Sequence, residues 1–217
     1  MGHFEKLIVS PRIHLVLMAG ESESVKITYH GIEESKINVM VKGNTLHLYL
    51  DHARLKEKQV RVWENEEWHK RDTYRDASVT AYVTYRSLRK LVVRGEQDVD
   101  VDAIQARTFK LTAYGDCRLT LAGLHARKFK ACLYGQHTLM VRAGAVDIQK
   151  FKLFGENTID VAGIAGEEIA SATYGESKLK LNTSGNLRLV TFGESDVRVT
   201  GGADVDRFTF GSLAVRN

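Results

Sequence analysis

Five acidic residues, each directly after a glycine, are the side chains best suited to chemistry in this 217-residue chain. They are Glu96, Asp116, Glu156, Glu176 and Glu194. Carboxylates held close together can bind a hard cation such as calcium, or cleave a glycosidic bond as an acid and base pair. Gln136 and Ser212 interrupt the row, and the Gly-Gly-x-Gly-x-Asp calcium repeat is absent. We therefore expect solvated turn residues, and keep Glu156, Glu176 and Glu194 as candidate binding residues.

An aromatic residue stands directly before six glycines that are spaced 18 or 20 residues apart in the second half of the chain. The six are Tyr114, Tyr134, Phe154, Tyr174, Phe192 and Phe210. Outward-facing rings could form a platform on which sugars stack, whereas rings that pack on one another would stabilise the fold by about 0.5–1.5 kcal/mol per pair. The pattern favours the structural role. Tyr114, Tyr134, Phe154 and Tyr174 are nevertheless candidate binding residues.

Two tryptophans, Trp63 and Trp68, lie in the most polar stretch of the chain, residues 54–76. Charge runs usually mark exposed segments, so a long solvated hairpin or insertion loop is the favoured interpretation. Exposed tryptophan is unusual without a partner, and long loops often carry binding residues. Trp63 and Trp68 are therefore kept as candidates for a binding loop.

Motifs of catalysis and cofactor binding are missing from the sequence. There is no Gly-x-Ser-x-Gly elbow, His-Glu-x-x-His helix, Walker loop or dinucleotide-binding glycine motif, and the eight histidines show no metal spacing. This predicts a protein without enzymatic activity, cofactor or metal. Cys117 and Cys132 occupy different registers of the repeat, which favours two separate small core residues and leaves a disulfide as the alternative.

The strands that would position these residues follow from the spacing of seven glycines. Gly95, Gly115, Gly135, Gly155, Gly175, Gly193 and Gly211 are separated by 20, 20, 20, 20, 18 and 18 residues. The fourth and sixth residues after each of the first six glycines are branched aliphatics, and the residue between them is mostly polar, which is typical of a strand with one buried face. Repeats of this length predict an all-β fold, a right-handed parallel β-helix (β-solenoid) of about seven rungs with glycine at a corner of positive φ.

The first part of the chain also reads as β, but with a shorter and less regular period. We expect residues 1–87 to form irregular rungs or a β cap, with the charged insertion at 54–76, and residues 88–217 to form the regular repeat. No linker rich in glycine, serine or proline intervenes. The whole chain, 1–217, is therefore predicted to be a single elongated β domain.

Charge and hydropathy exclude several partners. The 31 Lys and Arg residues and 27 Asp and Glu residues are interspersed, for a net charge of +4. No basic block is visible, so a nucleic-acid partner is not expected. No stretch reaches the roughly 18–20 apolar residues that span a bilayer.

The chain resembles the putative auto-transporter adhesin, head GIN domain family of bacterial envelope proteins. The resemblance starts with the alternating strand at residues 4–10, continues through residues 13–17, 25–27 and 43–48, and runs from residues 88–91 into the glycine repeats. Members of the family often have Gly-Ser-Gly-like corners where this chain has Gly-Glu, Gly-Asp or Gly-Gln. The resemblance implies a secreted or periplasmic β-helical protein, and it brings no catalytic residues with it.

These observations predict a non-enzymatic, exported binding or adhesion module of the cell envelope, periplasmic or extracellular. Its expected partner is a glycan or a cell-surface protein. A polysaccharide-active enzyme that uses the acidic row is one alternative. A structural module that stacks end to end, as a homo-oligomer through the C-terminal rung, is another.

Overall fold

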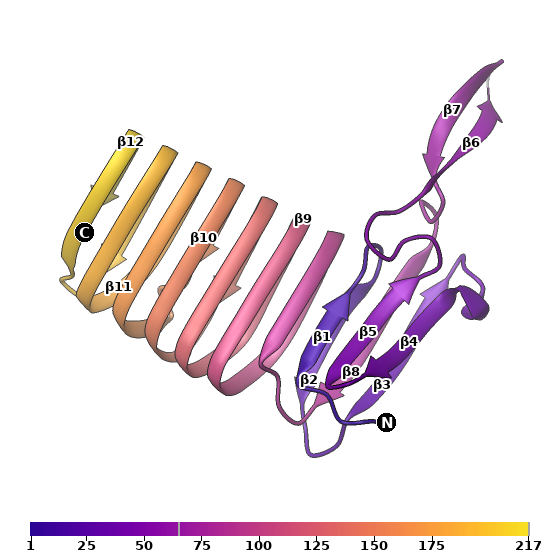
Figure 1. Ribbon diagram of the computed structural model, residues 1–217, viewed down its shortest axis with the longest axis horizontal. Helices are drawn as coiled ribbons and strands as arrows, with labels where there is room; N and C mark the ends of the chain where they lie inside the picture. The colour runs from indigo at the N-terminus through magenta and orange to yellow at the C-terminus, as the bar shows by residue number, and fades with distance from the viewer. Residues whose placement is uncertain (65, 217) are drawn as a thin grey trace.

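The computed structural model describes residues 1–64 and 66–216 and is built almost entirely of β-strands (Figure 1). The elements are β1 (Lys6–Val9), β2 (His14–Ala19), β3 (Ser24–His30), the 3-10 turn η1 (Glu34–Lys36), β4 (Ile37–Lys42), β5 (Thr45–Leu50), β6 (Gln59–Glu64), β7 (Glu67–Asp72), β8 (Ser78–Tyr85), β9 (Lys90–Val141), β10 (Gly144–Asp160), β11 (Ile164–Thr200) and β12 (Asp204–Arg216). None of the described residues belongs to a helix long and apolar enough to cross a membrane.

Strands β9 to β12 wind into a parallel solenoid, which confirms the predicted fold class. Each turn pairs with the next at a fixed offset, so that Phe154 lies between Tyr134 and Tyr174, and Phe192 pairs with Phe210. The strands are long because the ladder of hydrogen bonds continues through the corners of the rungs. In Figure 1 the successive turns stand side by side as a row of nearly identical loops.

The glycines form the column of corners that the spacing predicts. All seven have positive φ, between +98° for Gly155 and +131° for Gly211. A side chain at Gly135 would collide with the carbonyl oxygen of Gly115, and one at Gly175 would collide with that of Gly155. Glycine is thus required both by the backbone conformation and by the close approach of the neighbouring rung.

The core lies inside the rungs. The aliphatic rows four and six residues after each of the first six glycines are buried, and they end at Val197 and Val199. In the last rung Val215, the partner of Val197, is partly exposed. On the opposite wall, Phe109 and Phe129 stack at 5.8 Å. In the next rung the large aromatic residue lies two positions later along the strand. Phe151 pairs with Ala131, while Gln149 pairs with Phe129. Phe151 therefore packs edge-on against Phe129.

The N-terminal strands extend both walls of the solenoid and then close them. On one wall, residues 90–93 of β9 pair in parallel with β1, β1 pairs with β5, and antiparallel β4 forms the edge. On the other wall, residues 99–101 pair with β2, β2 pairs with β8, and antiparallel β3 forms the edge. This mixed sheet covers the first regular rung, as a capping element must.

The insertion at residues 54–76 replaces a corner of this cap. Strand β5 lies on the same wall as β1, and β8 lies on the same wall as β2. The corner between β1 and β2 passes through Pro11, which lies directly against Gly95. The insertion between β5 and β8 stands at the equivalent corner. The insertion therefore leaves the cap at the end of the glycine column. Its strands β6 and β7 form a separate antiparallel hairpin that projects away from the body (Figure 1).

Substitution Gly135→Ala tests the role of the corner column. We expect it to lower the free energy of unfolding by at least about 2 kcal/mol, because it adds backbone strain and a collision with the rung below. Chemical denaturation measures the loss. Gly202→Ala is the matched control, since Gly202 has φ +78° but no atom within 4 Å of an added Cβ. Equal losses at the two positions would show that stacking of the corners is not what demands glycine.

Candidate functional site

Each rung presents outward side chains on both sides of its glycine corner, and these form two faces. Residues one, three and five positions before each glycine form what we call the aromatic face. Residues one, three and five positions after it form the acidic face. The alternation follows the pleat of the strands: Leu111 and Ala113 are buried, whereas Lys110 and Tyr114 are exposed.

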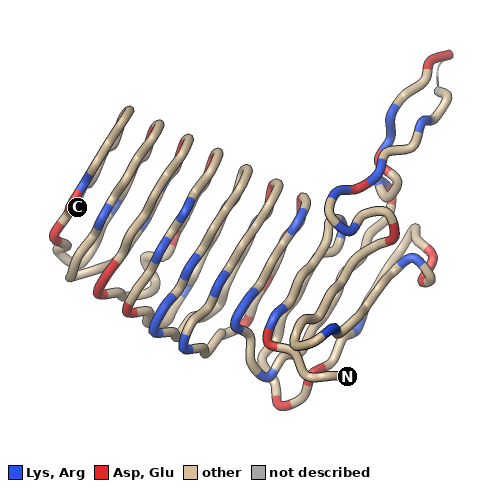
Figure 2. Tube along the Cα trace, viewed as in Figure 1, with Lys and Arg blue, Asp and Glu red and all other residues tan. Residues whose placement is uncertain are grey.

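The two faces differ in net charge. The aromatic face carries seven basic residues (Lys90, Arg94, Lys110, Lys130, Lys150, Lys152 and Arg188) and one acidic residue (Asp206). The acidic face carries nine acidic residues (Glu96, Asp98, Asp100, Asp116, Glu156, Asp160, Glu176, Glu194 and Asp196) and five basic ones (Arg118, Lys178, Lys180, Arg198 and Arg216). Charges that are interspersed in the sequence are thus sorted in space, since every turn returns a position to the same wall (Figure 2).

Five rings stack into one continuous ladder on the aromatic face: Tyr114, Tyr134, Phe154, Tyr174 and Phe192. Neighbouring ring centroids are 4.8–5.1 Å apart, and neighbouring planes differ by at most 5°. The ladder also points outward, because 43% of Tyr114 and 42% of Tyr174 remain exposed. The rings therefore both pack on one another and face outward, so the two arrangements that the sequence left open occur together.

The stacking decides what the ladder can bind. Ring faces inside the ladder are covered by the neighbouring rings, so a sugar cannot stack on them. What remains exposed is a strip of ring edges with the hydroxyls of the three tyrosines. The ladder ends at Phe192: its next ring contact, Phe208, is tilted by 58°, and Phe210 is 76% exposed without stacking on Phe192.

The acidic row lines a groove on the other face. Glu156, Glu176 and Glu194 are exposed along a hollow of about 490 Å³ whose walls also include Asp116 and Lys178. Basic residues farther from the corner neutralise part of this face, as where Lys180 Nζ lies 2.9 Å from Asp160. Among the described residues, no three His, Cys, Asp or Glu side chains are grouped so that they could hold a metal ion.

A column of buried or half-buried polar side chains lies beneath the corners, two residues after each of the first six glycines. Its members are Gln97, Cys117, His137, Asn157, Ser177 and Ser195. At one end the hydroxyls of Ser177 and Ser195 lie 2.9 Å apart, and Ser177 also donates to Thr173. At the other end the Cys117 thiol donates to the carbonyl of Gly95 over 3.1 Å, and burial raises the pKa of this thiol to about 12. The sequence did not reveal this column, because its residue type changes at almost every rung.

His137 is one of the members of the column whose side-chain polar atoms are unsatisfied, together with Gln97 and Asn157. Its side chain is 3% exposed, and neither ring nitrogen has a hydrogen-bond partner among the described residues. Burial lowers the pKa of His137, while the nearby Tyr134 backbone and the charge of Asp116 act in the opposite direction. Protonation in place would put an unpaired charge inside the solenoid.

The two tryptophans face each other across the projecting hairpin. Trp63 pairs with Trp68 in the β6–β7 ladder, and their rings meet edge to face at 5.4 Å. Both are open to solvent, at 57% and 65%. The polar insertion is therefore a hairpin that presents two tryptophans, and its position keeps them away from the aromatic ladder.

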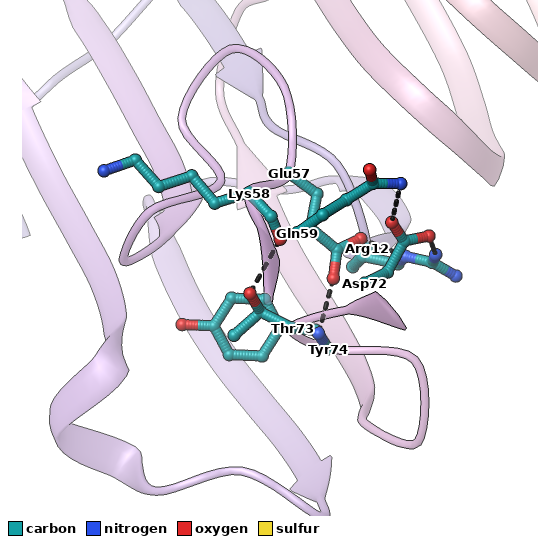
Figure 3. A network of polar contacts seen from close by, with 7 residues as sticks. All are labelled: Arg12, Glu57, Lys58, Gln59, Asp72, Thr73 and Tyr74. Carbon is teal, nitrogen blue, oxygen red and sulfur yellow. Dashed lines mark hydrogen bonds and ion pairs between the residues drawn. The ribbon is translucent and has the colours of Figure 1, made fainter. Parts of the chain in front are cut away.

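A polar network fixes the base of this hairpin (Figure 3). Arg12 donates to Glu57 over 2.6 Å and to Asp72 over 2.9 Å, and the hydrogen bond to Glu57 raises the Arg12 pKa. Glu57 also accepts the Tyr74 amide, and Thr73 donates to the Lys58 carbonyl. Because Arg12 follows Pro11 in the corner of the cap, the network joins the hairpin to the end of the glycine column.

The two cysteines lie on opposite sides of the backbone and do not form a disulfide. Cys117 belongs to the buried column. Cys132, in contrast to the prediction of a core residue, lies on the aromatic face beside the ladder, where its thiol contacts the Tyr134 hydroxyl at 3.2 Å. The pleat explains the difference, because the two positions have opposite parity relative to the glycine corners.

Comparisons with known proteins give the same architecture. The family model described as "Putative auto-transporter adhesin, head GIN domain" matches residues 3–203. A crystal structure titled a putative adhesin from Bacteroides fragilis is 15% identical, with a TM-score of 0.75 over 99% of this chain and 93% of that one. The fold is shared by a putative adhesin from Parabacteroides merdae, which is 12% identical with a TM-score of 0.60 over 100% of this chain and 92% of that one. It is also shared by a structure titled a putative lipid binding protein from Parabacteroides distasonis, which is 12% identical with a TM-score of 0.60 over 99% of this chain and 91% of that one. No curated protein matches the chain.

His137 makes a pH dependence testable. Because its folded-state pKa lies below the ordinary value of about 6.5, the unfolded chain binds the proton more readily, and stability is lost as the pH falls below 6.5. The loss cannot exceed about 1.4 kcal/mol per pH unit for one group. The next rung has Asn157 at the equivalent position. We expect the substitution His137→Asn to reduce the pH dependence of the free energy of unfolding between pH 7.5 and 5.5. His125→Asn, at an exposed position, is the control and should leave the profile unchanged. A profile that keeps its slope in His137→Asn would contradict this assignment.

Proposed function

Since the chain belongs to the putative auto-transporter adhesin, head GIN domain family, we propose that it is a non-catalytic binding module of the bacterial cell envelope. Its partner is a glycan or a cell-surface protein, and the contact surface is the aromatic face. The family description supports a place in the envelope, periplasmic or extracellular. The observation that carries the choice of surface is the outward ladder of stacked rings.

The ladder is an unusual surface for a protein to expose to water. Its ring edges form an apolar strip five rungs long, and contiguous exposed apolar surface is a common feature of interaction sites. The strip is also rigid, because each of the three inner rings is held between two others. A rigid surface loses little conformational entropy when a ligand binds, which favours affinity. The tyrosine hydroxyls add hydrogen-bonding groups along the same line.

The acidic face supports the non-catalytic role. Glycoside hydrolysis needs two carboxyl groups with different environments, one protonated and one ionised. Glu156, Glu176 and Glu194 occupy equivalent positions on successive rungs and are all exposed, so the fold gives them no distinct environments. The groove beside them is accordingly assigned no reaction.

A binding experiment with paired aromatic variants tests the proposal. Glycan arrays and pull-downs with surface-labelled bacterial cells identify a ligand, and the affinity is then measured for the double variant Tyr134→Thr and Tyr174→Thr. We expect a loss of at least tenfold, about 1.4 kcal/mol, because the strip of ring edges is broken in two places. Thermal unfolding of each variant shows that the solenoid remains folded.

The double variant Trp63→Thr and Trp68→Thr is the matched control, since it also removes two exposed aromatic rings. We expect its affinity to stay within about twofold of the parent. Loss of binding in the hairpin variant alone would move the site to the hairpin. Arrays and pull-downs that stay blank, or new reducing ends when polysaccharides are incubated with the protein, would contradict a non-catalytic binding module.

A further inference from the structure

We propose that the ligand of the aromatic face is a linear acidic polysaccharide that lies along the solenoid axis, its anionic groups bound by a row of lysines. The inference rests on the proposed function and names the class of ligand.

A row of lysines runs parallel to the aromatic ladder, five residues before each of the first four glycines of the repeat. Lys130 and Lys150 are direct neighbours on adjacent strands, and Lys6 and Lys90 are neighbours at the start of the solenoid. The twenty-residue offset places Lys110 between Lys90 and Lys130. Adjacent rungs bring these ammonium groups to within reach of one another, at a backbone spacing of about 4.8 Å.

Most of the row lacks neutralising partners in the part of the chain that the structure describes. Lys110 and Lys130 are exposed, and neither has a carboxylate partner among the described residues. Lys150 has only Glu168, 3.4 Å away. Like charges at this spacing repel, and a face with six surplus positive charges attracts anions. A ligand with regularly spaced anionic groups would relieve the repulsion along the whole row.

The surface beside the row suits a chain of sugars. Between the lysines and the rings lies a middle row in which Thr112, Cys132 and Ala172 have short side chains and the exposed Lys152 adds a further positive charge. The lysine and aromatic rows are four residues apart along each strand, about 13 Å. A polysaccharide can therefore lie over the short side chains, with lysines on one side and ring edges on the other. Aromatic edges are electropositive, which favours contact with sugar oxygens.

The same geometry argues against nucleic acid, the other common linear polyanion. Proteins that bind single strands stack bases on free aromatic faces. Here the faces of Tyr134, Phe154 and Tyr174 are covered by neighbouring rings whose centroids are 4.8–5.1 Å away, so bases have no platform along the ladder. Acidic sugars need no such platform, because their contacts are ionic and through the edges of the rings.

Binding to defined polymers tests the inference. The probes are polygalacturonate, chondroitin sulfate, neutral dextran, single-stranded DNA and phosphatidylglycerol vesicles. We expect binding to polygalacturonate or chondroitin sulfate that weakens with added salt, and none to dextran. The triple variant Lys110→Gln, Lys130→Gln and Lys150→Gln should lose at least tenfold in affinity and most of the salt dependence. It should remain folded, since the substituted side chains lie on the surface.

The matched control removes three positive charges from the acidic face: Arg118→Gln, Lys178→Gln and Arg198→Gln. Its net charge equals that of the lysine variant, and we expect its affinity to stay within about twofold of the parent. Equal losses in both triple variants would show a net-charge effect and overturn the proposal. Tighter binding to DNA or vesicles than to either acidic polysaccharide would also overturn it.

The outcome separates this inference from the proposed function. If a neutral glycan or a surface protein binds through the ladder and is indifferent to the lysine variant, the ligand class is wrong and the binding module stands. If no probe, array glycan or cell surface binds, both fail.

Discussion

The close approach of successive glycine corners is the constraint on which the rest of the molecule depends. Each corner places its backbone where a side chain of the next rung would have to be, as between Gly115 and Gly135. This contact fixes the register of the rungs without slippage. Every outward position therefore repeats along a straight row, one rung at a time. The rows of rings, of lysines and of carboxylates are consequences of that register.

A surface made of rows differs from a conventional active site. In the groove beside Glu156 and Glu176, equivalent groups repeat from rung to rung, so the chemistry of each row is multiplied along the axis. The aromatic row gains rigidity from this arrangement, while the lysine row gains repulsion that a ligand can relieve. The acidic row lies on the other wall, where basic residues such as Lys180 neutralise part of it. The two walls thus offer opposite electrostatic surfaces to the surroundings.

The sequence predicted the elements that repeat in type and missed those that repeat only in position. The glycine corners, the two aliphatic rows and the aromatic row keep their residue types, so periodicity alone reveals the parallel β-solenoid. The buried column under the corners changes from Cys117 to His137 to Asn157, and a pattern of types cannot show it. The lysine row escaped notice because its members are twenty residues apart and other basic residues lie between them. The sequence could not place the tryptophan hairpin at the end of the corner column, because that position follows only from the pairing of β5 with β1 and of β8 with β2.

A crystal structure of the protein with an acidic oligosaccharide long enough to span four rungs is the most direct test of the claim that the aromatic face is the binding surface. We predict that the sugar lies parallel to the solenoid axis, with its anionic groups at Lys110, Lys130 and Lys150 and its rings against the edges of Tyr114, Tyr134 and Phe154. A sugar bound in the groove beside Glu156 and Glu176, or at Trp63 and Trp68 of the hairpin, would contradict the account.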